Sequence, residues 1–185
     1  MNEIIPASTG GTFCLRKVTV VDPGGPHHDS TVDILIRDGV IVKVGERVSA
    51  KEAQEVKIDG AHASPGWVDL RAHFRDPGEE WKQGITNGLD AAAAGGFTAV
   101  AVLPSTEPVI DDRSGIGYLL QQAKDHPVRL LPIGALTKGL KGQQLAELHD
   151  QREAGAVAFS DDQHSVRNSR LMLLALQYSA GMHAK

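Results

Sequence analysis

The stretch that decides the fold is residues 65–78, with the sequence PGWVDLRAHFRDPG. Before it, between residues 12 and 59, short runs of β-branched residues are separated by turn-forming residues. After it, apolar strands alternate with helical segments, which predicts right-handed β-α-β units and a parallel sheet. The stretch therefore separates a small antiparallel β-domain, residues 12–63, from an α/β domain, residues 64–185. Residues 1–11 are predicted to form a flexible tail.

The β-domain contains one strong hairpin signal. Val32, Ile34 and Ile36 alternate with more polar neighbours, and Asp38-Gly39 links this run to the apolar residues 40–44. A type I′ turn requires positive φ at both central residues, which Asp-Gly tolerates well. We therefore expect an antiparallel hairpin here.

About four strand–helix units follow in the α/β domain. Periodicity alone fits either an open doubly wound sheet or part of a (β/α)8 barrel, and it leaves both open. Neither G-x-G-x-x-G nor a phosphate-binding loop stands at a strand-to-helix turn, which disfavours a nucleotide-binding open sheet. The expected strands are 67–74, 97–103, 128–136 and 156–160, and the expected helices are 79–94, 111–126, 143–154 and 168–180.

Composition excludes several classes of protein. The 185 residues are 41% hydrophobic and carry a formal net charge of −4, which disfavours both disorder and nonspecific nucleic-acid binding. The single cysteine, Cys14, excludes an internal disulfide framework and a multi-cysteine zinc site, and it suits the reducing cytoplasm. No apolar run has the roughly 18 residues of a membrane span.

Functional groups of parallel α/β folds gather at the carboxyl ends of the strands. Strand alternation places Asp69, Arg71, His73 and Arg75 on one face of the first strand. These side chains are either a solvated strand end with local ion pairs or the lining of a site. In a site, His73 is a candidate metal ligand or general base, and Arg75 a candidate anion clamp.

A second candidate cluster follows the fourth strand. Asp161 and Asp162 either cap the next helix or supply a carboxylate ligand to a divalent metal ion. Spacing alone does not decide between these two roles.

Four segments together resemble one family. Residues 65–78 are similar to the dihydroorotase signature P-G-x-x-D-x-H-x-H-x-R-[DE]-P-G, within the amidohydrolase superfamily. Residues 92–98 (AAAGGFT), 103–108 (LPSTEP) and 155–162 (GAVAFSDD) resemble A-A-x-G-G-[FY]-T, M-P-N-T-x-P and G-A-x-A-F-[ST]-D-D of the same family. The segments occur in the family's order over residues 56–180. The resemblance implies an amidohydrolase-type barrel behind a small β-domain, and so favours the barrel over the open sheet.

The resemblance also implies site roles. Dihydroorotases reversibly hydrolyse the ring amide of dihydroorotate in de novo pyrimidine biosynthesis, with zinc activating the attacking water. Carried over, His73 matches the second histidine of the metal-binding pair and Asp162 the metal carboxylate. Arg75 matches the arginine that holds the substrate carboxylate.

Two departures put this chemistry in doubt. Arg71 stands where the first histidine ligand belongs, and Ser105 replaces the asparagine that contacts substrate. A guanidinium remains protonated and offers no lone pair to a metal, so zinc binding is predicted to be lost or weakened. Asp162 is then the expected ion-pair partner of Arg71, and Ser105 a weak substrate contact. A cation at position 71 that replaces the metal charge is a hypothesis.

Three functions follow as hypotheses. The first is a degenerate dihydroorotase, a scaffold or regulatory partner of aspartate carbamoyltransferase, as inactive relatives in the family are. The alternative is an active cyclic amidohydrolase, of dihydroorotase, hydantoinase or allantoinase type, with an altered metal site. The third is an unrelated α/β binding module. Candidate partners are aspartate carbamoyltransferase and a second copy of the chain, and neither nucleic acid nor a membrane is expected.

Chain length bears on the same choice. A (β/α)8 barrel typically has about 250 residues, whereas four strand–helix units are expected here. We therefore expect a first half of a barrel, either a fragment or a truncated product whose last strand exposes an unpaired edge. Later site residues of the family have no counterpart in these four units.

Overall fold

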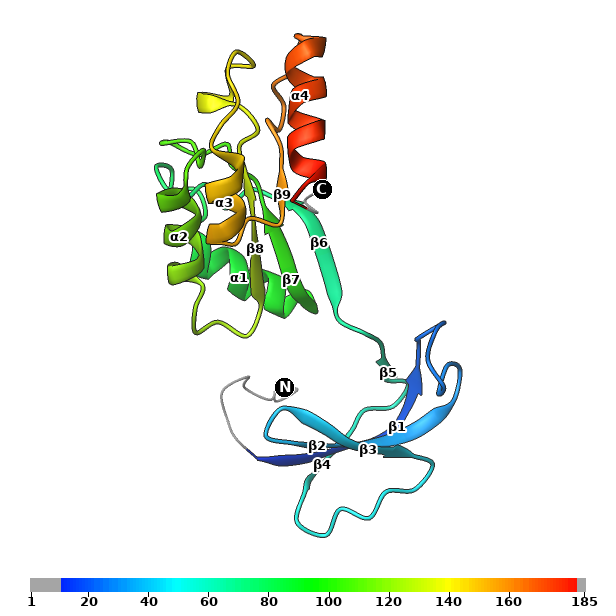
Figure 1. The fold of residues 1–185 in the computed structure, drawn as a ribbon. Coiled ribbons are helices and arrows are strands. Elements are labelled where there is room, and N and C mark those ends of the chain that lie inside the picture. Colours follow the sequence, from blue (N-terminus) through cyan, green and yellow to red (C-terminus); the bar gives the residue numbers. More distant parts are fainter. Residues whose placement is uncertain (1–10, 183–185) are drawn as a thin grey trace. The chain divides into compact units, whose positions relative to one another are not determined.

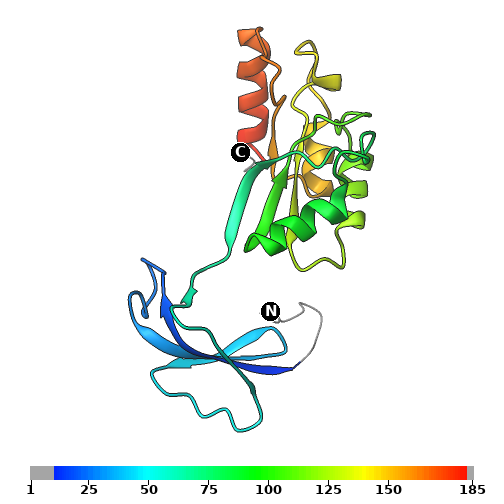
Figure 2. The ribbon, with the colours of Figure 1, turned by 180° about the vertical axis from the view of Figure 1, so that it is seen from behind.

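A computed structural model describes residues 11–182, shown in Figures 1 and 2. The chain divides into two compact units, Met1–Pro65 and Gly66–Lys185, here called the β unit and the barrel unit. The tail predicted for residues 1–11 lies, apart from Gly11, outside the described residues.

The β unit is built on one five-stranded sheet. Its order is β3-β2-β1-β4, and β5 also pairs with β1. The pairs β1–β2 and β2–β3 are antiparallel as expected, but β4 and β5 run parallel to β1. No two-residue turn joins β3 to β4, so β4 is free to cross to the far edge of the sheet. The strands are β1 (Thr12–Val20), β2 (Thr31–Arg37), β3 (Val40–Gly45), β4 (Gln54–Lys57) and β5 (His62–Ala63).

The predicted hairpin turn joins β2 to β3. Asp38 and Gly39 have φ angles of 49° and 78°, both in the left-handed region that a type I′ turn needs. The Asp-Gly pair therefore sets the turn and places the two strands side by side.

A buried carboxylate fixes an irregular part of the β unit. The register of β1 shifts around Lys17, whose φ is 55°. The Asp33 carboxylate accepts hydrogen bonds from the backbone N–H groups of Lys17 (3.0 Å) and Val48 (3.2 Å), and pairs with the Arg16 guanidinium at 2.7 Å. Burial raises the pKa of Asp33, but the two N–H donors and the guanidinium outweigh it and hold that pKa below its usual value.

The barrel unit contains a four-stranded parallel sheet in the order β6-β7-β8-β9. Both views show α1, α2 and α3 on one face of this sheet (Figures 1 and 2). Sequential order without a reversal, with helices on one face, is the pattern of a barrel and not of a doubly wound sheet. The elements are β6 (Trp67–Ala72), α1 (Ile85–Ala94), β7 (Phe97–Val102), α2 (Arg113–Gln122), β8 (Arg129–Gly134), the 3-10 turn η1 (Lys138–Leu140), α3 (Leu148–Ala154), β9 (Ala158–Phe159) and α4 (Ser169–Ala180).

The middle strand β7 is buried on both faces, as its apolar sequence predicts. Val100 and Val102 pack against α1 and α2 in the largest core cluster. Ala101 and Leu103 point the other way and pack with Ile133 of β8. Apolar packing on both faces holds β7 firmly in the sheet, and β7 in turn fixes the positions of the strands paired with it.

Two helices begin later than predicted. The helix expected at residue 79 starts at Ile85, because Gly84 has a φ of 78° and its N–H bonds the Phe74 carbonyl. The Asp76 carboxylate then accepts from the Ile85 N–H at 3.2 Å. The helix expected at residue 143 starts at Leu148, because backbone groups of residues 144 and 146 bond back to the loop after β8.

The other two helices begin at their predicted caps. Asp112 accepts from the Gly115 N–H at 2.8 Å, and Asn168 accepts from the Leu171 N–H at 3.1 Å. Within residues 11–182, none of the helices combines the length and apolar character that a membrane crossing requires.

Candidate functional site

Four polar side chains meet at the carboxyl ends of the barrel strands. Arg71 is on β6, His73 directly follows it, Ser105 follows β7, and Asp162 follows β9. Ser105 and Arg71 lie 57 and 91 positions from Asp162 along the chain, yet both contact it. Parallel strands end at one edge of a sheet, which brings these distant residues together.

Asp162 is the centre of this group, here called the Asp162 cluster: Arg71, His73, Ser105 and Asp162. The Arg71 Nη2 donates to Oδ1 of Asp162 at 2.7 Å, and the Ser105 hydroxyl donates to Oδ2 at 2.7 Å. The His73 Nε2 lies 3.5 Å from the same Oδ2. The expected ion pair between Arg71 and Asp162 is therefore formed, and each carboxylate oxygen has a donor.

The surroundings of Asp162 favour its charged form. Its side chain is only 3% exposed, and this burial raises the pKa of the carboxyl. The Ser105 hydrogen bond, the electrostatic effect of the neighbouring His73 and the Arg71 guanidinium outweigh burial and hold the pKa of Asp162 below its ordinary value. The carboxylate is thus kept ionised by side chains of this chain.

His73 lies between the other members of the cluster. Its Nδ1 is 3.4 Å from the Ser105 hydroxyl oxygen, and its Nε2 is 3.5 Å from the Asp162 carboxylate. Both distances exceed those of strong hydrogen bonds, so the ring packs beside the carboxylate without being fixed by it.

The Asp162 cluster does not fit a divalent metal ion. Arg71 Nη2 lies 2.7 Å from Oδ1 of Asp162, where its charge repels a bound cation, and the Ser105 hydroxyl lies 2.7 Å from Oδ2. The guanidinium of Arg71 adds a fixed positive charge at the position where the resemblance implies a ligand. His73 and Asp162 therefore lie together, as the resemblance implied. Arg71 and Ser105 are hydrogen-bonded to the same Asp162 carboxylate.

Arg75 does not join this cluster through its described contacts. The prediction that Asp69, Arg71, His73 and Arg75 share one strand face is wrong, because β6 ends at Ala72 and Arg75 has a φ of 61°. Arg75 instead pairs with Glu79 at 3.4 Å. The Asp69 carboxylate accepts from the backbone N–H of Arg71 at 2.9 Å.

Asp161 has a different role from its neighbour. It is buried and accepts hydrogen bonds from the backbone N–H (2.8 Å) and the hydroxyl of Thr137. Neither aspartate caps α4, whose cap is Asn168, so the capping interpretation is wrong. Asp161 ties the loop after β8 to the turn that presents Asp162.

A cavity of about 340 Å³ adjoins the cluster between β9 and α4. Asp161, Asp162 and His164 supply its polar wall, and Phe159 and Met172 part of its apolar wall. Arg71, His73 and Ser105 are not among the residues that line this cavity, so it lies beside the cluster and not over it.

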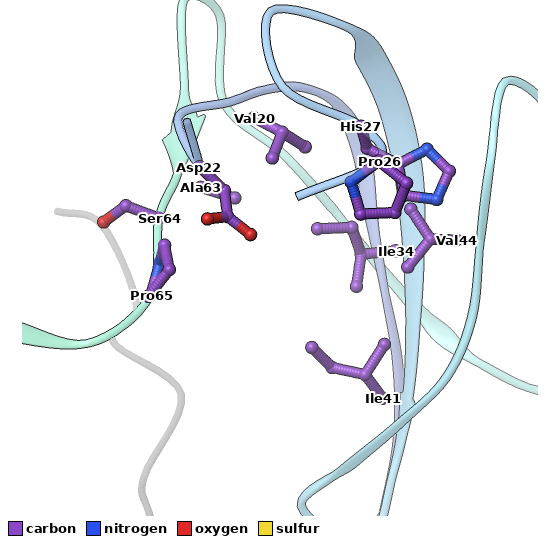
Figure 3. Close-up of a pocket in the computed structure, with 10 residues that line it drawn as sticks. All are labelled: Val20, Asp22, Pro26, His27, Ile34, Ile41, Val44, Ala63, Ser64 and Pro65. Carbon is purple, nitrogen blue, oxygen red and sulfur yellow. The ribbon is translucent and has the colours of Figure 1, made fainter. Parts of the chain in front are cut away.

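A second cavity, of about 260 Å³, lies inside the β unit (Figure 3). Ile34, Ile41 and Val44 give it an apolar wall, and Asp22 and His27 are polar side chains at its edge. Pro65 of the signature segment lines it, but none of the residues to which the resemblance assigns a site role does, and we assign it no role.

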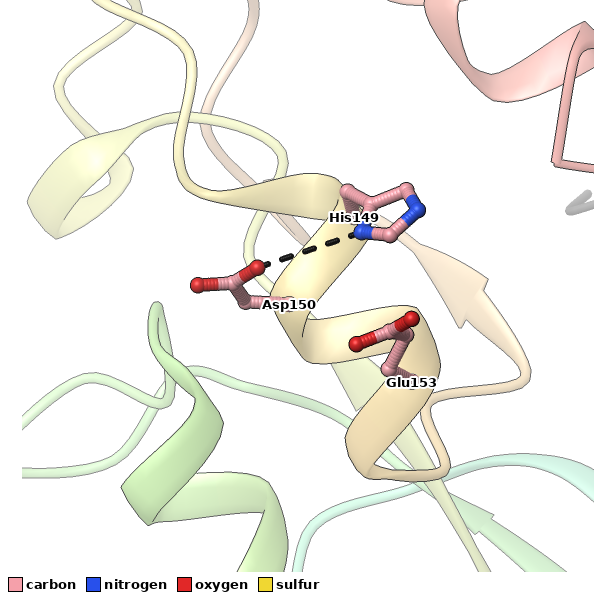
Figure 4. Close-up of side chains that lie close together, drawn as sticks. All are labelled: His149, Asp150 and Glu153. Carbon is pink, nitrogen blue, oxygen red and sulfur yellow. Dashed lines mark ion pairs between the residues drawn. The ribbon is translucent and has the colours of Figure 1, made fainter.

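A further group of possible ligands lies on the outside of α3. His149, Asp150 and Glu153 are exposed, and their ligand atoms lie within 4.8 Å of one another (Figure 4). His149 and Asp150 lie four and three residues before Glu153, spacings that bring side chains together on a helix surface. Arg113 also approaches Glu153, at 4.0 Å, and this exposed group is a solvated helix surface.

Solved structures with the same fold define the class of protein. The structure titled L-hydantoinase (dihydropyrimidinase) from Arthrobacter aurescens superposes with a TM-score of 0.75 at 20% identity, covering 94% of this chain and 39% of that one. A dihydroorotase crystal structure gives 0.67 at 18% identity, covering 94% and 49%. The barrel unit and the β unit together therefore have the fold of an amidohydrolase-superfamily half-barrel with its β-domain, as expected.

Sequence comparison narrows the class to a family. The family described as "Dihydro-orotase-like" matches residues 61–184. The dihydroorotases of Citrifermentans bemidjiense and Geobacter metallireducens are 44% and 42% identical over 165 residues, 88% of this chain. The chain belongs to the dihydroorotase-like family. It spans 39% of the length of each of these two relatives.

Proposed function

We propose that this chain belongs to a dihydroorotase-like protein of de novo pyrimidine biosynthesis that does not hydrolyse the dihydroorotate ring amide. It serves instead as a scaffold or regulatory partner. The observation that supports this most strongly is the 2.7 Å ion pair between Arg71 and Asp162. In this pair, Arg71 binds the carboxylate that the family resemblance assigns to the metal ion.

The chemical reason for the proposed inactivity is that the water that attacks the ring amide must first be activated. Metal-assisted hydrolysis needs an ion that lowers the pKa of bound water from about 15.7 towards neutrality. Arg71 has no lone pair for such an ion, and its guanidinium lies 2.7 Å from Asp162, where its fixed positive charge opposes a bound cation. Of the two residues in this chain that the resemblance assigns to the metal, His73 keeps its imidazole and Asp162 is paired with Arg71.

Substrate fixing is weakened as well. The Ser105 hydroxyl proton is used on Asp162, and Arg75 pairs with Glu79, which also contacts Lys82. The two residues that the resemblance assigns to substrate are therefore engaged within the chain. Zinc is the family's expected cofactor, and we propose that its binding here is lost or weak.

Hydrolysis assays test the proposal directly. The intact protein is incubated with dihydroorotate and with a hydantoin, with and without added zinc, and ring opening is followed. We expect no turnover above the uncatalysed background under any condition. Turnover that disappears in a His73→Ala variant would contradict the proposal and leave the alternative, an active cyclic amidohydrolase with an altered metal site.

The proposed partner is aspartate carbamoyltransferase, as for inactive members of the family, and a second copy of the chain is the other candidate. Under this proposal the chain and its partner reside in the cytoplasm, which the single cysteine of the chain supports. Tagged intact protein is expected to co-purify with aspartate carbamoyltransferase from its own cells. Recovery as a lone monomer under mild conditions would contradict the scaffold role.

A further inference from the structure

The two departures from the family pattern meet on one side chain. Arg71 and Ser105 stand at the positions of a metal ligand and a substrate contact, in motifs more than 30 residues apart. In the folded chain each donates to a different oxygen of Asp162, both at 2.7 Å. If the site had only lost its function by random substitution, the two replaced residues would have no reason to bind the same carboxylate.

We propose that Arg71 and Ser105 act as one unit that replaces a metal ion at Asp162 and holds the strand ends of the barrel unit together. This inference rests on the proposed function and deepens it, because it says what occupies the closed site. The guanidinium supplies the positive charge, and the hydroxyl supplies the second donor.

Burial explains why a replacement is needed. The Asp162 side chain is 3% exposed, and an ionised carboxylate without a partner at such a site is costly. A neutral histidine at position 71 would bring no charge, so the carboxylate would depend on a bound ion. Arg71 is 59% exposed at its side chain, so its own charge stays hydrated while one nitrogen reaches Asp162.

The geometry also links three strand ends. Arg71 comes from β6, Ser105 from the segment after β7, and Asp162 from the segment after β9. A metal ion with ligands on these segments would tie them together, and the two hydrogen bonds do so here. The inference therefore predicts that the barrel unit is stable without a metal, and that neither zinc nor a chelator will change its melting temperature.

A double-mutant cycle on the intact protein tests the inference. Arg71→Met is expected to lower the melting temperature by about 5 °C and Ser105→Ala by about 3 °C. In an Asp162→Asn background, which has no charge to neutralise, Arg71→Met is expected to lower it by only about 1 °C. Arg71→Lys keeps the charge and should fall between wild type and Arg71→Met.

Two matched variants control for side-chain loss. Arg113 is an exposed arginine whose nearest carboxylate is 4.0 Å away, so Arg113→Met should leave the melting temperature within about 1 °C. Ser114 on the exposed side of α2 gives the corresponding Ser114→Ala control. If Arg71→Met cannot be purified, the Ser105–Asp162 cycle tests the same coupling with the milder change.

Two outcomes would overturn the inference. One is an equal loss from Arg71→Met with and without the Asp162 carboxylate, since the arginine would then act elsewhere. The other is a rise in the wild-type melting temperature on adding zinc. Neither outcome depends on ring-opening activity, so an inactive protein that fails these tests would refute the replacement while leaving the proposed function standing.

Discussion

Two buried aspartates, one in each unit, pair with arginine but are held in different ways. Asp33 in the β unit accepts two backbone N–H groups besides Arg16. Asp162 in the barrel unit accepts from the side chains of Arg71 and Ser105. Backbone donors are supplied by the fold whatever the sequence, whereas side-chain donors change with single substitutions. The hydrogen bonds of Asp33 therefore depend mainly on the backbone fold, whereas those of Asp162 depend on two side chains that single substitutions can remove.

The largest expected effect is at the backbone-held carboxylate. Asp33→Ala leaves the N–H groups of Lys17 and Val48 without their acceptor and removes one of the partners of Arg16, which keeps Glu55 and the Val48 carbonyl. The unfolding free energy of the β unit should therefore fall by about 3 kcal/mol. Urea denaturation followed by circular dichroism measures it. Asp59→Ala, at an exposed aspartate of the same unit, is the matched control, and similar losses from both variants would remove the distinction.

The next largest effect is expected at Asp162, the carboxylate that is held by side-chain donors. Arg71→His removes the fixed charge and adds a second imidazole beside His73 and Asp162, so the variant should gain zinc. At a zinc concentration 100-fold above the dissociation constant, stability should rise by about 2.7 kcal/mol. Zinc content per chain and melting temperature with and without zinc are the measurements. Unchanged zinc content would show that more than residue 71 separates this site from a metal site.

A smaller effect is expected at Asp161, which combines both kinds of donor. Thr137→Val removes the hydroxyl, which donates to Asp161 and accepts from the Gly142 N–H at 2.9 Å, but keeps the backbone N–H that donates to Asp161 at 2.8 Å. The barrel unit should lose about 1 kcal/mol of unfolding free energy, measured by urea denaturation. A loss as large as that of Asp33→Ala would mean that the hydroxyl matters more than the backbone donor.

The smallest expected effect is a pH dependence. The pKa of Asp33 is lowered in the folded state, so the unfolded chain binds its proton more readily and stability falls as pH falls. Its contribution is complete above the unfolded value of about 3.9 and is lost as pH drops through the lower folded value. The stability gap between wild type and Asp33→Asn should therefore narrow below about pH 4. A gap constant from pH 7 to pH 3 would contradict this assignment.

Local signals predicted the parts of the molecule that depend on neighbouring residues. Asp38-Gly39 requires positive φ and forms the turn, and Asp112 and Asn168 cap their helices through N–H groups three residues ahead. The start of α1 was predicted six residues too early, because the contacts that delay it come from Phe74 and Asp76 outside the helix. Capping within one turn is visible in sequence, and competition from another segment is not.

The sequence by itself determined the family, the succession of strands and helices, and the charge argument that pairs Arg71 with Asp162. Only the tertiary structure decided that β4 and β5 run parallel to β1, and that Ser105 donates to Asp162. The physical reason is distance along the chain. Charge and turn chemistry act between residue types that can be recognised locally, but which oxygen receives which donor depends on where the ends of separate strands meet.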